Sequence, residues 1–200
     1  MENSNNQVKV LIWPSMKNRD RRSIDIDGHV EVLVLGMCYG FFPTLTGTFY
    51  TSQIKEGCKG ILLKRSFGDV ARWYEGRVKR SRKRASYLDD PTKFERLPVI
   101  SVYTLETSDE SVKELVKFLE SKIANPPLYS YYSDVPDSRN CQTISKEALV
   151  FAGIFGQDLD DAHDVSPDSL SDLLSQKSKS EQLQLTPASW TKIKKEGYNI

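Results

Sequence analysis

One cysteine lies where an apolar helical pattern begins. The stretch Asn140–Ile154 reads NCQTISKEALVFAGI and follows a turn-prone run, SDVPDSRN. The apolar residues that recur at helical spacing are Ile144, Ala148, Phe151, Ala152 and Phe155. A thiol in the first turn of a helix faces the positive end of the helix dipole, which stabilises the nucleophilic thiolate. Cys141 is therefore a candidate nucleophile, and the alternative is an inert, buried core thiol.

A cysteine hydrolase or transferase also needs a base for the thiol proton and donors for the oxyanion. The chain has only two histidines, His29 and His163. His29 belongs to the alternating run DGHVEVLVLG, whereas His163 lies in the acidic run QDLDDAHD, which is typical of a solvated loop. We expect His29 to be the base, and the backbone N–H groups at the helix start to bind the oxyanion. The alternative for His29 is a core histidine bonded to the backbone.

A third polar group usually orients the imidazole of such a pair. Glu31 shares a strand face with His29, so it is a candidate for this role. Two residues apart on one strand is an awkward spacing, and this favours a strand-end carboxylate that reaches water. A Cys–His pair alone, or a partner such as Thr51 or Ser52, remains an alternative. Cys38 and Cys58 do not begin a predicted helix, and we interpret both as structural.

Composition limits the other classes of function. The 200 residues carry a formal net charge of +1, so no global field favours nucleic acid or membrane. Three cysteines without a CxxC motif argue against a disulfide framework and a zinc site, and we expect neither a cofactor nor a metal. The N-terminal sequence lacks the features of a Sec signal peptide, and no apolar run is long enough for a transmembrane helix. These features predict a cytoplasmic protein, or one delivered by a specialised secretion system.

The elements that must position the pair are predicted from periodicity. Strands are expected over 8–13, 27–36, 37–42 and 97–105, and helices over 107–123, from 141, from 167 and from 187. The strand with His29 is apolar on both faces and should be central. The basic stretch Lys64–Arg84, with a possible helix from Arg72, could bind an acidic protein or an anionic lipid surface. A solvated helix or loop is the favoured alternative, because runs of charge usually face water.

Several short motifs occur in a characteristic order. They are Gly28-His29-Val30, the run Tyr39-Gly40-Phe41-Phe42-Pro43, and Asn140-Cys141 before an Ala-Leu-x-x-Ala-Gly helix at 148–153. In this order the chain resembles the circularly permuted branch of the papain-like superfamily, the relatives of NlpC/P60 peptidases. Trp13-Pro14 and the run Ser166–Leu170 are similar to patterns of uncharacterised bacterial members.

The resemblance implies an α+β fold, in which an antiparallel papain-like sheet packs against the cysteine helix. Residues 1–175 would form this domain, with a basic insertion at about 44–96, and 176–200 would be a polar linker and a C-terminal helix. The implied activity is that of a peptidase, amidase or acyltransferase with Cys141 as nucleophile, His29 as base and a covalent acyl-enzyme. Because no third residue is evident, a non-catalytic protein- or anion-binding module on a degenerate scaffold is the alternative, including a secreted bacterial effector.

Overall fold

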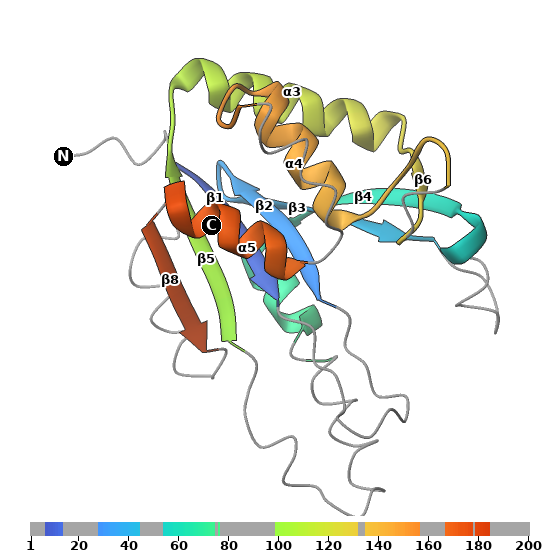
Figure 1. Cartoon of the computed structure of the whole chain (residues 1–200), viewed down its shortest axis with the longest axis horizontal. Coiled ribbons are helices and arrows are strands. Elements are labelled where there is room, and N and C mark those ends of the chain that lie inside the picture. Colours follow the sequence, from blue (N-terminus) through green and yellow to red (C-terminus); the bar gives the residue numbers. More distant parts are fainter. Residues whose placement is uncertain are drawn as a thin grey trace, which may run out of the picture.

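The fold is mixed α+β. A computed structural model describes residues 7–13, 28–44, 54–74, 76, 99–131, 135–156, 167–177 and 179–184. Its strands are β1 (Gln7–Trp13), β2 (His29–Val34), β3 (Met37–Pro43), β4 (Cys58–Ser66), β5 (Val99–Glu106), β6 (Leu128–Tyr129), β7 (Ser138–Arg139) and β8 (Lys179–Gln184). Its labelled helices are α3 (Asp109–Ala124), α4 (Cys141–Phe151) and α5 (Pro167–Lys177). The strands form one sheet in the order β7-β6-β4-β3-β2-β1-β5-β8 (Figure 1).

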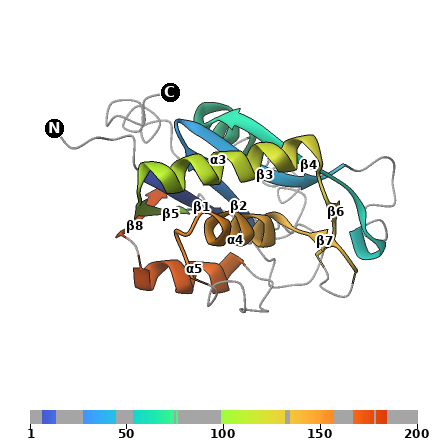
Figure 2. The same ribbon diagram turned by 90° about the horizontal axis from the view of Figure 1, so that it is seen from above.

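Helices cover both faces of this sheet. Seen from above, α4 and α5 lie on one face, and the helical segment 67–74 lies on the other (Figure 2). The alternation of β2 separates the two cores. Val30, Val32 and Val34 belong to the core under α3, α4 and α5, whereas Leu33 belongs to the core under segment 67–74. Every residue of β2 is buried, so the prediction of a central strand covered on both faces is confirmed.

Strands β2 and β3 diverge at one end. They pair from Val34↔Met37 only as far as Glu31↔Gly40, and β3 then continues along β4 to Pro43↔Gly60. The first residues of β2 remain paired with β1, where His29 lies opposite Trp13. The two pairs of strands therefore open into a fork beyond Glu31, which is visible in Figure 1. Helix α4 packs against both β2 and β3, so it spans the two sides of this fork.

Several expected boundaries are wrong. The stretch 44–96 is not wholly an insertion, because residues 58–66 form β4, and residues 60–66 of this strand pair with β3. The polar stretch after 176 is not a linker, because Lys179–Gln184 form β8 on the outer edge of β5. Helix α3 begins at Asp109 with Ser108 as its N-cap, two residues later than the expected start at 107. The basic residues Arg77–Arg84 and the expected helix from 187 lie outside the described residues.

Other boundaries are confirmed. Helix α4 begins at Cys141, with Asn140 as its N-cap, and α5 begins at Pro167. None of the described helices combines the length and the apolar character that crossing a bilayer requires.

Candidate active site

Cys141 is the first residue of α4, and the chain fixes this start strongly. Asn140 adopts an extended backbone, and its side-chain Oδ1 accepts from the N–H groups of Gln142 and Thr143, both at 2.9 Å. In return, the Asn140 N–H donates to the Thr143 hydroxyl at 2.7 Å, which completes a capping box. Arg139 also forms an ion pair with Glu147 one turn further along. Together these contacts hold the thiol at the positive end of the helix.

His29 and Cys141 lie near enough for the charge and the hydrogen bonding of Cys141 to act on the imidazole, so the two predicted partners meet at the fork. Both residues are only 5% exposed, which strengthens the electrostatic effect of each on the other. Burial lowers the pKa of His29, but the charge and hydrogen bond of Cys141, and then those of Glu31, outweigh burial and raise it to about 9. The effect of Cys141 requires a negative thiolate. A positive imidazolium at this position would in turn stabilise the thiolate form of Cys141 as an ion pair.

Glu31 is the third member of this cluster. Its Oε1 lies 3.2 Å from Nε2 of His29, and its side chain is completely buried. The expectation that Glu31 reaches water is therefore wrong. The expected awkward geometry is also absent, because consecutive outward positions of the strand bring the carboxylate beside the ring. Since Nε2 faces Glu31, the other ring nitrogen, Nδ1, is left for Cys141.

Arg65 of β4 completes the cluster, and it was not predicted, because nothing distinguishes it from its neighbours within the basic run. Its Nη2 donates to the same Glu31 oxygen at 2.6 Å. The guanidinium lies over the rings of Phe42 (4.8 Å) and Trp73 (5.2 Å). A buried strand carboxylate needs a counter-charge. The described strand with neighbouring basic residues on the far side of β3 is β4. The need of Glu31 for a counter-charge could therefore have pointed to a basic residue of this strand.

A small gap in the packing of β3 makes room for the carboxylate. Gly40 is the cross-strand partner of Glu31, and a Cβ atom at Gly40 would lie 2.7 Å from Glu31 Cδ.

The ring of His29 is itself held by aromatic neighbours, with ring centroids 4.5 Å from Phe42 and 5.8 Å from both Trp13 and Trp73. The side chains around the imidazole thus come from five segments of the fold, namely β1, β2, β3, the helical segment 67–74 and α4.

Fewer backbone N–H groups at the start of α4 are available to bind an oxyanion than the sequence predicted. The N–H groups of Gln142 and Thr143 are used by the Asn140 side chain, and that of Ile144 by the Asn140 carbonyl. Within the described part of the chain, the Cys141 N–H has no hydrogen-bond partner. This amide lies beside the thiol and is the remaining backbone donor of the first turn for a developing oxyanion.

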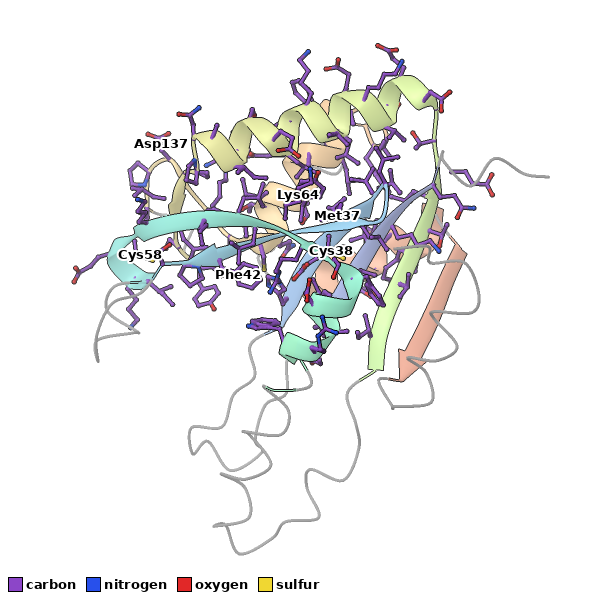
Figure 3. All side chains as sticks on the ribbon, turned by 180° about the vertical axis from the view of Figure 1, so that it is seen from behind. Met37, Cys38, Phe42, Cys58, Lys64 and Asp137 are labelled. Carbon is purple, nitrogen blue, oxygen red and sulfur yellow. The ribbon has the colours of Figure 1, made fainter. Side chains whose placement is uncertain are left out.

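The other two cysteines differ from Cys141. Burial raises the pKa of Cys38 well above its ordinary value, and the nearby Glu31 charge adds to this. Burial also raises the pKa of Cys58. Seen from behind, Cys38 lies near the helical segment 67–74 and Cys58 at the opposite end of β4 (Figure 3). All three thiols are free, and both of these environments disfavour the thiolate.

The described part of the basic stretch is largely neutralised within the chain. Lys64 pairs with Glu120 at 2.7 Å, and Arg72 pairs with Asp69 at 2.6 Å. Arg65 is committed to Glu31. Binding of an acidic protein or an anionic lipid by Lys64–Arg84 would therefore depend on the residues after 76. The other residues considered for the site, His163, Thr51 and Ser52, lie outside the described residues.

The described residues include no group of three or more His, Cys, Asp or Glu side chains arranged to hold a metal ion. Comparisons with protein-family models, with curated proteins and with solved structures found no match to this chain. The likeness to permuted papain-like proteins therefore stays a prediction.

Proposed function

We propose that the protein is a cysteine hydrolase or acyltransferase in which Cys141 is the nucleophile and His29 the general base and acid. The observation that carries the proposal is the proximity of Cys141, at a capped helix N-terminus, to His29, whose far ring nitrogen lies 3.2 Å from Oε1 of the buried Glu31. An adjacent base, itself oriented by a third group, is the recurring arrangement of an activated nucleophile.

The chemistry follows from the pair. The Cys141 thiolate attacks an acyl carbon and forms the C–S bond, while the Cys141 N–H donates to the resulting oxyanion. The imidazolium of His29 gives its proton to the leaving amine or alkoxide as the bond to carbon breaks. In the second half, neutral His29 takes a proton from water or from another acceptor. That acceptor attacks the thioester, and the Cys141 sulfur leaves as thiolate.

The acceptor decides between hydrolysis and acyl transfer, and the described residues favour neither. The order of the histidine strand and the cysteine helix supports the permuted papain-like assignment, and so does the packing of α4 on β2. The alternative of a degenerate binding module was motivated by the lack of a third residue. Glu31 removes that motive, because its carboxylate faces Nε2 of His29.

The proposal is tested with p-nitrophenyl acetate. This activated ester is small, so its reaction depends on the nucleophile and the base and not on substrate recognition. Wild-type protein should form an acetyl adduct that mass spectrometry of peptides places on Cys141, and the adduct should then turn over. His29→Gln should slow both steps, since the nucleophile loses its base. General bases typically contribute about 10²–10⁴-fold, so a loss of this order is expected.

Cys58→Ala is the matched control, because Cys58 is also a free thiol but lies away from His29. It should form and turn over the adduct like the wild type, whereas Cys141→Ala should form none at that position. Acetylation mainly at Cys38 or Cys58 would contradict the proposal. An adduct on Cys141 that forms equally fast in His29→Gln would contradict the role of His29.

A further inference from the structure

A completely buried carboxylate does not stay ionised without a partner. Burial disfavours the charged form of a carboxyl group, and in an apolar surrounding without a partner the protonated form would be the more stable one. Arg65 supplies the compensating charge, since a guanidinium does not deprotonate in proteins and lies 2.6 Å from Oε1. The contact uses one nitrogen. Arg65 Nε and Glu31 Oε2 are buried without a hydrogen-bond partner among the described residues.

The protonation state of Glu31 decides which tautomer of neutral His29 is stable. An ionised carboxylate only accepts hydrogen bonds, so it holds the proton of the ring on Nε2 and leaves the Nδ1 lone pair facing Cys141. A protonated carboxyl group could instead donate to Nε2. The ring proton would then lie on Nδ1, and His29 could not take a proton on the side of Cys141.

We propose that Arg65 is a positioning residue, which keeps Glu31 ionised and thereby holds His29 in the tautomer that acts as base. This inference rests on the proposed function of Cys141 and His29. Arg65 acts through Glu31 and needs no contact with substrate, since its side chain is 17% exposed and its guanidinium lies over Phe42 and Trp73.

The charges around the cluster predict the direction in which the pKa of His29 changes when Arg65 is removed. The groups that act on His29 are Cys141 from α4 and Glu31 from its own strand. Those near Glu31 are His29, Arg65 from β4 and Cys38 from β3. Removing a positive charge by itself would raise the pKa of His29. If Arg65 acts through Glu31, its removal lets Glu31 become neutral, and the pKa of His29 falls instead.

The experiment compares Arg65→Met, Glu31→Gln and the double variant, with Arg72→Met as matched control. Arg72 forms an exposed ion pair with Asp69 on the neighbouring helical segment. Two readouts are used: the titration of His29 by NMR, and the rate of Cys141 alkylation by iodoacetamide at pH 7. We expect Arg65→Met to lower the titration midpoint and to slow alkylation roughly tenfold, which is what one pKa unit represents. Arg72→Met should match the wild type.

The double variant should alkylate no more slowly than Glu31→Gln alone, because Arg65 has no further role once Glu31 is neutral. A raised His29 midpoint in Arg65→Met, or a further tenfold loss in the double variant, would overturn the inference. If Arg65→Met does not fold, the comparison of Glu31→Gln with the double variant decides alone: equal rates support the inference and a further loss overturns it. Failure of the proposed function looks different, since Cys141 would then react no faster than Cys58 in the wild type.

Discussion

Nε2 of His29 and Oε1 of Glu31 lie 3.2 Å apart, although the two residues are separated by a single position on one strand. Successive outward side chains of a strand stand about 7 Å apart at the backbone. The imidazole leans toward Glu31 because the rings of Trp13, Phe42 and Trp73 surround it. A carboxylate and an imidazole at neighbouring positions on one strand face can therefore meet when the packing around them fixes the ring.

Glu31→Gln tests the role of this contact in turnover. The glutamine amide has the shape of the carboxylate, but its NH₂ group can donate to Nε2 and stabilise the wrong tautomer. We expect deacylation of acetyl-Cys141 to slow by about 10²-fold, the low end for general-base catalysis. The decay of the adduct is followed by mass spectrometry.

Glu120→Gln provides the control for that change. Glu120 accepts from Lys64 and Tyr39 on the surface, away from the pair, so its variant should deacylate at the wild-type rate. Equal rates in both variants would mean that Glu31 does not act on His29 during turnover.

The titration of His29 gives a prediction with a definite sign. Its pKa is raised from 6.5 to about 9, so His29 should remain protonated through neutral pH and lose its proton near pH 9. Cys141→Ala and Glu31→Gln each remove negative charge that raises this pKa, and burial, which lowers it, remains. The midpoint should therefore fall in both variants. NMR of ¹³C-labelled histidine measures this directly, because the chain has only two histidines.

His29→Gln identifies the signal of His29 in those spectra, since only His163 then remains. A midpoint of His29 near 6.5 in the wild type would contradict the ion pair. So would a midpoint that does not change when Cys141 is replaced.

Gly40→Ala should disturb the site through crowding. The new Cβ atom would lie 2.7 Å from Glu31 Cδ, so the carboxylate must move away from His29 or Arg65. Overpacking of this kind typically costs about 1–3 kcal/mol of stability. We expect a lower urea midpoint together with slower alkylation of Cys141 by iodoacetamide.

Gly60→Ala separates crowding from chemistry. Its Cβ atom would meet Phe41 Cζ at 2.2 Å and the Pro127 carbonyl oxygen at 2.5 Å, whereas a Cβ atom at Gly40 would meet the Glu31 side chain. This variant should also lose stability, but the alkylation rate of its folded fraction should equal that of the wild type. If both variants alkylate equally slowly, the effect of Gly40→Ala is a general loss of stability.

Local patterns predicted the elements that carry the site, and long-range pairing completed it. The start of α4 followed from Asn140 and the apolar stripe after Cys141, and the faces of β2 followed from its alternation. Glu31 was a candidate because it shares a strand face with His29, but its burial and its contact with Arg65 did not follow, because Arg65 reaches Glu31 only through the pairing of β4 with β3. The same pairing turned the expected insertion into a strand of the sheet. Register between distant strands is not visible in local periodicity.

The N-cap allows stability and reactivity to be changed separately. Asn140→Ala removes the acceptor for two N–H groups and should cost about 1 kcal/mol of stability, measured by urea unfolding. Asn140→Asp keeps an equally good cap, so its stability should stay close to that of the wild type. Its new negative charge lies next to the thiolate, however, and like charges disfavour each other's ionised form. We therefore expect Asn140→Asp to alkylate more slowly than the wild type at pH 7, with little loss of stability. If Asn140→Asp reacts as fast as the wild type, the thiolate of Cys141 is not the species that limits the reaction.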